Sequence, residues 1–310
     1  MSDHIRLSVV VPCYNEEEGI AELHRRLSTA CAGFEPYEVV MINDGSRDGT
    51  WGALQSMCKQ DPHLVAVSLS RNHGHQIALS AGLSIARGER LFILDADLQD
   101  PPELLDKMMT VLDRGVDVAY GQRRTRPGDS PAKRVACAVF YRLLSRLADV
   151  DIPLDTGDFR LITRRVTDII NAMPERHRFV RGMIGWIGFR QEPVYYDRDA
   201  RFAGTTKYPL RKLIRLALDG VTGFSVKPLR LAAYVGVFVA LFGFGLIVYS
   251  LLSWIRGNTP GGWVSLMAAI AILGSMQLIM LGIFGEYLGR LYEQSKGRPL
   301  FSVDVVIRSR

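Results

Sequence analysis

Apolar and polar positions along residues 5–120 follow two alternating patterns. Five short apolar runs read "LSVVVP", "EVVMIN", "LVAVSL", "RLFILD" and "VDVAYG". Between them, near residues 17–32, 49–59, 74–87 and 102–114, apolar side chains recur at helical spacing. The pattern predicts strands alternating with helices. Because the strands are apolar throughout, it favours an α/β fold with a mostly parallel, Rossmann-like sheet covered on both faces.

Two longer apolar segments follow near the C-terminal end. Residues 231–254 and 263–285 contain no charged side chain, and a short turn-forming link, "IRGNTPGG", joins them. Each segment is long enough to cross a hydrocarbon core about 30 Å thick. The sequence therefore predicts an antiparallel hairpin of two transmembrane helices. Two buried helices of a soluble protein are the alternative, which the uninterrupted length of both segments disfavours.

The charges around the hairpin predict its orientation. Lys227 and Arg230 precede the first span, and three cations follow the second, whereas Arg256 is the only cation in the turn. The positive-inside rule then places the N-terminal α/β domain and both termini on the cytoplasmic side of the cell (inner) membrane. We expect four parts: a cytoplasmic domain at 1–208, an interfacial amphipathic helix at 209–228, the hairpin at 229–288 and a cytoplasmic C-terminal tail at 289–310.

Composition narrows the class of partner. The 310-residue chain has a formal net charge of +6 and a pI near 9.2, which indicates an acidic partner. Basic amphipathic stretches at 133–147 and 209–216 carry much of this charge next to apolar side chains, as helices on anionic lipid do. A membrane therefore explains the charge better than nucleic acid. The four cysteines form no CxxC pair, so we expect reduced packing residues.

Polar side chains gather where the predicted strands end. In a parallel sheet these carboxyl ends face one crevice, where ligands bind. The five strand ends carry Tyr14, Asn15 and Glu16; Asn43 and Asp44; Arg71 and Asn72; Asp95 and Asp97; and Gln122, Arg123 and Arg124.

The acidic cluster after the fourth strand is typical of a metal site. If the strand conformation persists through Asp97, then Asp95 and Asp97 point to the same side and offer two oxygen ligands for Mg²⁺ or Mn²⁺. Asp100 precedes two prolines and a glutamate, which predicts the N-cap of a helix. His73 and His75 have the spacing of a metal pair but no evident third ligand, so we expect them to form hydrogen bonds in a loop.

Five ordered motifs carry a resemblance to a known family. The segments "VVVPCYNEEEGI", "VVMINDGSRDGT", "LSRNHGHQIALSAGL", "LDADLQDPPEL" and "TGDFRL" resemble the family 2 glycosyltransferases, which have the GT-A fold. The resemblance covers roughly residues 7–225. Together with the hairpin it extends to the polyprenyl-phosphate glycosyltransferase branch, which includes bactoprenol glucosyltransferases and dolichyl-phosphate mannose synthase.

The resemblance implies roles for matching residues. Pro12, Tyr14 and Glu16 would line the base and ribose, and Asp44 would contact the nucleoside. The family more often has two acids at this second motif, whereas this chain has Asn43 and Asp44, so only the Asp44 contact is carried over. Asp95, Asp97 and Gln99 would bind the metal and the diphosphate, and Arg201 and Lys207 would also bind the diphosphate. Arg123 and Arg134 would bind the acceptor phosphate. Asp97 and Asp158 are the residues with an implied catalytic role.

The implied reaction moves one hexose, with inversion, from a nucleotide sugar to polyprenyl phosphate. UDP-glucose and undecaprenyl phosphate are the expected substrates, with GDP-mannose or another UDP-sugar left open. A lipid monophosphate has a second pKa of about 6 and needs no base, so we expect Asp158 to orient more than to remove a proton. A processive polysaccharide synthase, a non-catalytic scaffold and a flippase are the alternatives, and a homo-oligomer is expected.

Overall fold

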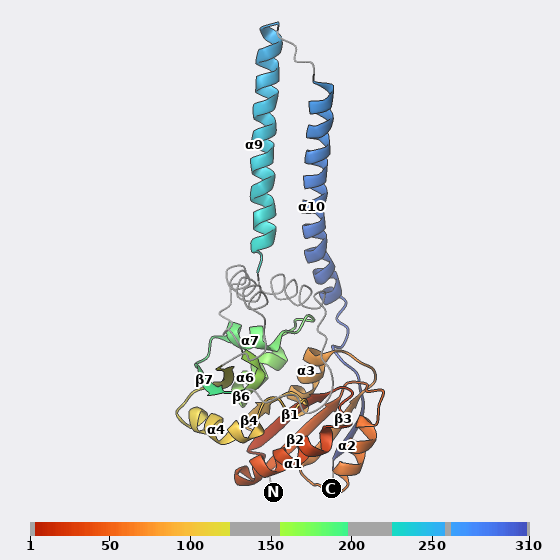
Figure 1. Ribbon diagram of the computed structural model, residues 1–310, viewed down its shortest axis with the longest axis vertical. Coiled ribbons are helices and arrows are strands. Elements are labelled where there is room, and N and C mark those ends of the chain that lie inside the picture. The colour runs from red at the N-terminus through yellow and green to blue at the C-terminus, as the bar shows by residue number, and fades with distance from the viewer. Residues whose placement is uncertain (1–3, 125–155, 198–224, 258–261, 309–310) are drawn as a thin grey trace.

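A computed structural model describes residues 4–124, 156–197, 225–257 and 262–308 of the chain. An α/β domain occupies one end of the molecule, and two long helices extend away from it (Figure 1). The basic segment at 133–147 and most of the expected interfacial helix at 209–228 lie outside the described residues.

The α/β domain is built on one eight-stranded sheet, in the order β7-β5-β6-β4-β1-β2-β3-β8. β6 and β8 run antiparallel to their neighbours, and the other pairs are parallel. The five predicted strands are therefore confirmed within a mostly parallel sheet. The strands are β1 (Leu7–Cys13), β2 (Tyr37–Asn43), β3 (Leu64–Leu69), β4 (Arg90–Ile93), β5 (Val118–Arg123), β6 (Thr156–Thr163), β7 (Gln191–Tyr196) and β8 (Val303–Arg308).

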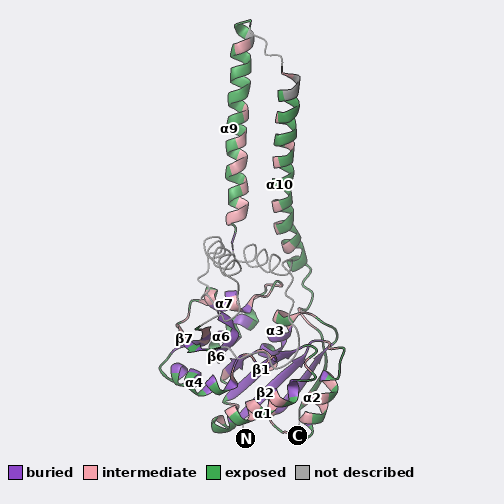
Figure 2. Cartoon of the chain, viewed as in Figure 1, coloured by how far each residue is buried: buried purple, intermediate pink, exposed green. Residues whose placement is uncertain are grey.

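Helices cover both faces of this sheet, as predicted. Side chains alternate along β1, so that Val9 and Val11 join one buried cluster and Val10 joins the other. The central strands β1 and β2 are coloured as buried (Figure 2). The helices and 3₁₀ turns of the domain are α1 (Ile20–Cys31), η1 (Ala32–Phe34), α2 (Thr50–Cys58), α3 (His75–Ile85), η2 (Pro102–Leu104), α4 (Leu105–Asp113), α6 (Arg164–Ala172) and α7 (Val180–Ile187).

Helix α3 packs unusually close to the sheet. A Cβ atom at Gly82 would lie 2.4 Å from Val10 Cγ1 and 2.5 Å from Ile42 Cδ1, which is too close for any larger residue. The glycine therefore lets α3 rest directly on β1 and β2. This contact fixes the first turn of α3, including His75 and Gln76, beside the carboxyl ends of the parallel strands.

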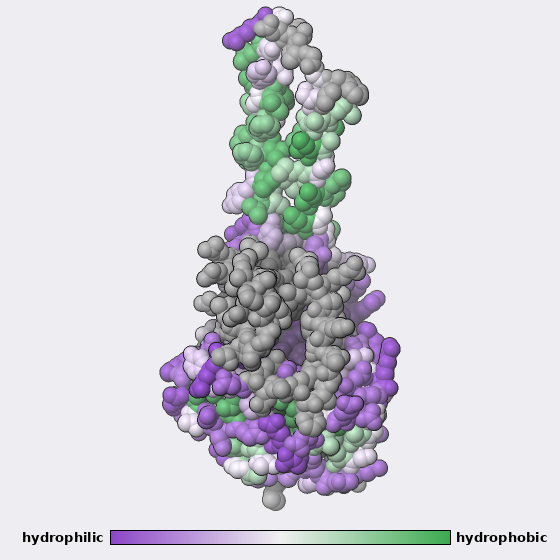
Figure 3. Space-filling view, in the orientation of Figure 1, coloured by the Kyte–Doolittle hydropathy of each residue, from purple (hydrophilic) through white to green (hydrophobic). Residues whose placement is uncertain are grey.

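The two predicted spans lie within long helices. α9 (Lys227–Ile255) and α10 (Trp263–Ser295) are both long and apolar enough to cross a membrane. They stand next to each other, and their surface is mostly hydrophobic, unlike that of the α/β domain (Figure 3). At their base, the Tyr287 hydroxyl donates a hydrogen bond to the Ser225 carbonyl at 2.7 Å. The protein is therefore membrane-associated, while its orientation remains a prediction.

The C-terminal segment adds a strand that the sequence pattern did not reveal. β8 pairs antiparallel with β3 at the edge of the sheet, and the Ser70 N–H donates to the Ser302 carbonyl at 3.0 Å. Ile307 packs against the buried cluster, and Arg308 lies 3.6 Å from the carboxylate of Glu38. Part of the expected tail at 289–310 thus ties the end of α10 back to the sheet.

Replacing Ile307 with alanine should lower stability more than replacing Val306. Ile307 is half-buried against the core, whereas Val306 is 44% exposed. We expect Ile307→Ala to cost about 1–2 kcal/mol, since partial burial gives less than a full core truncation. Thermal unfolding of the detergent-purified protein should show a fall of about 2–8 °C. Equal melting temperatures for both variants would contradict a packed β8.

Candidate active site

The end of β1 presents the first set of predicted side chains. Pro12 is buried within β1, whereas Tyr14, directly after it, is 42% exposed. The following loop is fixed by hydrogen bonds, because the Glu16 N–H donates to Thr50 Oγ1 at 2.9 Å and Asn15 Oδ1 accepts from the Arg47 N–H at 2.9 Å. The described geometry thus offers an exposed aromatic ring on an ordered loop. That this loop binds the nucleotide stays a prediction.

Asp44 at the end of β2 shapes the turn before α3. Its two carboxylate oxygens accept hydrogen bonds from the N–H groups of His73 at 2.7 Å and Gly74 at 2.9 Å. Gly74 has a φ of 94°, which favours glycine. Burial raises the pKa of Asp44, although these hydrogen bonds work in the opposite direction. The structure therefore gives Asp44 a role in positioning this turn, and the nucleoside contact stays a prediction.

The acidic motif after β4 does not continue the strand. β4 ends at Ile93, and Asp95 to Asp97 enter a turn in which Leu98 has a φ of 58°. The strand conformation on which the expected same-side placement of Asp95 and Asp97 depended therefore ends before the motif, because the chain turns after β4. The Gln99 N–H donates to Asp97 Oδ1 at 3.2 Å, so the motif is held as a compact turn.

The donor set still fits a hard divalent ion that shares its coordination with substrate. Asp95, Asp97 and Gln99 are only partly buried, and Asp95 Oδ1 accepts no hydrogen bond from the described residues. Across the described part of the chain, no group of three or more His, Cys, Asp or Glu side chains could hold a metal ion without further ligands. Mg²⁺ typically takes one or two carboxylates and completes its shell with water and substrate phosphates. These residues match such a partial site.

Asp100 is not a helix cap, contrary to the prediction. It is buried, and its Oδ1 accepts a hydrogen bond from the Tyr196 hydroxyl. The 3₁₀ turn η2 begins after Pro101 and has no side-chain cap. Arg123 at the end of β5 contacts both residues: its Nη2 lies 3.7 Å from Asp100 Oδ1, and its Nε donates a hydrogen bond to the Tyr196 hydroxyl at 3.2 Å. Partners on β5 and β7, distant in sequence, override the local capping signal.

Asp158 on β6 is the centre of a buried polar network. Gln76 Nε2 donates to its Oδ2 at 2.7 Å, and His75 Nε2 lies 3.3 Å from the same oxygen. Arg181 on α7 places Nη2 3.5 Å from Oδ1. His75 Nε2 also lies 3.4 Å from Asp95 Oδ1, so one imidazole links the Asp158 carboxylate to the acidic motif.

Electrostatics in this network keep Asp158 charged. Burial alone would raise its pKa, but Arg181, His75 and Arg160 outweigh burial and hold the pKa well below the usual range. Burial lowers the pKa of His75, yet Asp158 and Asp95 raise it to about 9, so the imidazole is cationic at neutral pH. Burial raises the pKa of Asp95 to about 6, with His75 opposing the shift.

Three members of this network were missed as site residues. His75 was expected to form hydrogen bonds in a loop; the hydrogen bond is confirmed, but His75 is the first residue of α3, and its contact with two acids was not predicted. Gln76 and Arg181 had no distinguishing signal, because their partners lie on other elements. The predicted residues Arg134, Arg201 and Lys207 lie outside the described part of the chain.

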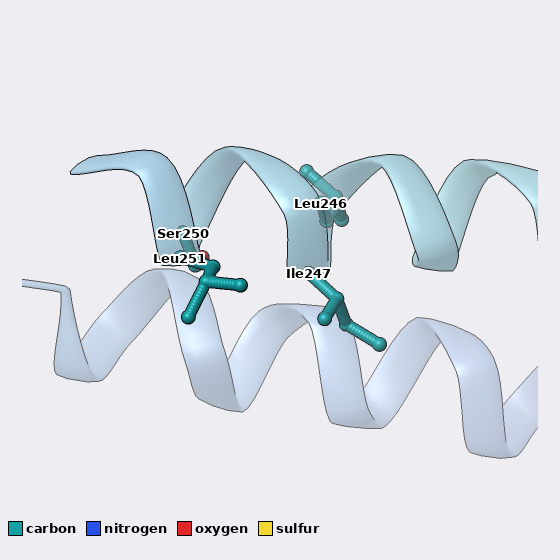
Figure 4. Close-up of a pocket in the computed structure, with 4 residues that line it drawn as sticks. All are labelled: Leu246, Ile247, Ser250 and Leu251. Carbon is teal, nitrogen blue, oxygen red and sulfur yellow. The ribbon is translucent and has the colours of Figure 1, made fainter. Parts of the chain in front are cut away.

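A shallow hollow in the hairpin is separate from this site. It has a volume of about 460 Å³ and is lined by Leu246, Ile247, Ser250 and Leu251 of α9 (Figure 4). These side chains lie in the apolar helix far along the chain from the acidic motif. A hollow with so few polar groups offers nothing to bind a nucleotide.

Comparison with known proteins identifies the family. The sequence profile of glycosyl transferase family 2 matches residues 8–170, and that of the GtrB C-terminal hairpin matches residues 227–291. The solved mannosyl-3-phosphoglycerate synthase from Rubrobacter xylanophilus is 17% identical, with a TM-score of 0.48 over 70% of this chain and 72% of that chain.

Curated relatives match nearly the whole chain. The uncharacterized glycosyltransferase YkcC of Bacillus subtilis is 44% identical over 98% of this chain and 94% of its own length. The bactoprenol glucosyl transferase of Shigella phage SfV is 39% identical over 96% of this chain and 98% of its own length. With its GT-A-like α/β sheet, acidic motif and apolar hairpin, the chain belongs to glycosyl transferase family 2 and is a glycosyltransferase that carries the GtrB C-terminal hairpin.

Proposed function

We propose that this enzyme transfers a single glucose from UDP-glucose to polyprenyl phosphate, with undecaprenyl phosphate as acceptor and inversion at the anomeric carbon. The observation that carries the proposal is the 39% identity to a bactoprenol glucosyl transferase over nearly all of both chains, hairpin included. In Figure 1, α3 and α7 lie on the side of the α/β domain nearest the hairpin. That arrangement supports an acceptor that is itself a membrane lipid.

The chemistry follows from the charges of the reaction. An acceptor phosphate oxygen attacks the anomeric carbon, and the bond from that carbon to the β-phosphate oxygen of UDP breaks. A bound Mg²⁺ or Mn²⁺, held by Asp95, Asp97 and Gln99, would offset the negative charge on the departing diphosphate. We assign Pro12, Tyr14, Glu16 and Asp44 to the nucleoside, Arg201 and Lys207 to the diphosphate, and Arg123 and Arg134 to the acceptor phosphate.

Asp158 supports this reaction as an orienting carboxylate. A general base works best when its pKa lies near the operating pH, whereas the pKa of Asp158 is held far below it. The acceptor phosphate is already largely ionised at neutral pH, since its second pKa is about 6. We therefore infer that the fixed negative charge of Asp158 positions the reacting groups.

The catalytic domain and both termini would face the cytoplasm, where nucleotide sugars are supplied. We further propose that the chain forms a homo-oligomer. GDP-mannose or another UDP-sugar is the alternative donor, because no described contact distinguishes uracil from guanine or one hexose from another. A donor panel separates these alternatives.

Detergent-purified protein should move labelled glucose from UDP-glucose into undecaprenyl phosphate in the presence of Mn²⁺ or Mg²⁺. EDTA should abolish transfer, and Asp97→Ala should reduce it by about 100-fold or more, since it removes a candidate ligand of the ion. Asp106→Ala, an exposed acid on α4, is the matched control and should transfer normally. UDP-galactose, UDP-N-acetylglucosamine and GDP-mannose should give little product. Faster transfer from one of these donors would overturn the choice of glucose.

Asp158→Asn should lower kcat by about 100-fold without removing an ionisation limb from the pH profile between about pH 6 and 9, although loss of the carboxylate lowers the pKa of His75 and moves any limb that His75 contributes. The reason is that Asp158 stays ionised throughout this range, because its pKa is held far lower. The measurement is kcat against pH for both proteins with saturating donor. Loss of one ionisation limb in the variant would instead show that Asp158 acts as a base.

A further inference from the structure

We propose that Gln76 is a positioning residue for Asp158: its side-chain amide fixes one carboxylate oxygen and ties it to α7, leaving the other oxygen to face the substrates. This inference rests on the proposed function, because it assigns Asp158 to the reacting groups of the transfer. Gln76 acts through Asp158 and is not itself expected to touch substrate.

The two ends of the amide make different hydrogen bonds. Nε2 donates to Asp158 Oδ2 at 2.7 Å, and Oε1 accepts from the backbone N–H of Val180 at 2.9 Å. A carboxylate cannot donate and a backbone N–H cannot accept, so this amide orientation is the one that satisfies both partners. Glutamine is thus suited to bridge β6 and the first residue of α7. An ionised glutamate could keep the Val180 contact but not the Asp158 contact.

The Gln76 hydrogen bond leaves the two carboxylate oxygens of Asp158 in different environments. Oδ2 receives the Gln76 hydrogen bond and faces His75. Oδ1 is buried and accepts no hydrogen bond from the described residues, and Arg181 lies 3.5 Å away. Oδ1 therefore has an ion pair with Arg181 but no hydrogen-bond donor among the described residues, so it can still accept a hydrogen bond. A donor group of the bound substrates, such as a sugar hydroxyl, would satisfy Oδ1, which makes it the oxygen that orients them.

Gln76 is itself held rigidly. It lies in the first turn of α3, which Gly82 allows to rest on β1 and β2. Its partner Val180 begins α7, and the next residue is Arg181, which faces Asp158. One side chain therefore sets the position of Asp158 relative to both α3 and α7. Catalytic groups need such support, because small displacements of a reacting group lower the rate strongly.

Two variants separate the contacts. Gln76→Met keeps the approximate volume and removes both hydrogen bonds, whereas Gln76→Glu keeps an acceptor for Val180 and places a second carboxylate against Asp158. We expect both to lower kcat by about 10- to 100-fold while the KM for the nucleotide sugar changes by less than about twofold. Gln60→Ala, at an exposed turn position just after the end of α2, is the control and should match the wild type.

A double-mutant cycle tests whether Gln76 acts through Asp158. Labelled-sugar transfer is measured for Gln76→Met alone, Asp158→Asn alone and both together. If the inference holds, adding Gln76→Met to Asp158→Asn lowers kcat by less than about twofold, since the group it positions has already been altered. An equal loss in both backgrounds, or full activity of Gln76→Met or Gln76→Glu, overturns it.

Hydrogen exchange supplies a readout that needs no turnover. Amides at the start of α7 should exchange faster in Gln76→Met than in the wild type, while those of α2 should not change. Unchanged exchange at α7 contradicts the bridge even if activity falls. A wild-type protein that transfers no sugar from any donor contradicts the proposed function instead, so the two failures are distinguishable.

Discussion

The buried negative charge of Asp158 is the constraint around which the rest of the site is arranged. An uncompensated carboxylate in a protein interior costs several kcal/mol. Here α3 supplies His75 and Gln76, and α7 supplies Arg181, so two helices and one strand must keep their relative positions for the charge to be tolerated. The same imidazole reaches Asp95, which joins the candidate metal ligands to the candidate orienting residue.

The sheet topology makes this convergence feasible. β4 lies between β1 and β6, so the acidic motif that follows β4 and Asp158 on β6 come from adjacent strands. α3 packs tightly on β1 and β2, which brings its first turn to the same end of the sheet. The topology therefore brings Asp158 next to His75 and the acidic motif, which lie more than 60 residues earlier in the sequence.

The hairpin is connected to this domain at several points. His177 lies 3.2 Å from Glu293 near the end of α10, and the Arg176 guanidinium donates a hydrogen bond to the Arg298 carbonyl just after that helix. β8 then returns the chain to the edge of the sheet. For an enzyme whose proposed acceptor is a membrane lipid, these contacts fix the height of the site relative to the apolar helices. Pairing with β3 and packing of Ile307 against the core explain why a C-terminal segment with little sequence signal forms a regular strand.

The sequence by itself determined the α/β alternation, the two apolar helices and the family, because apolar periodicity and ordered motifs are local properties of the chain. It also placed Asp95 and Asp97 after the end of a predicted strand, and the family resemblance singled out Asp158. Only the tertiary structure decided that Asp100 pairs with Arg123 and Tyr196, that β8 extends the sheet, and that His75, Gln76 and Arg181 surround Asp158. These contacts join residues far apart in sequence, and their energy comes from burial and charge pairing that no local pattern encodes.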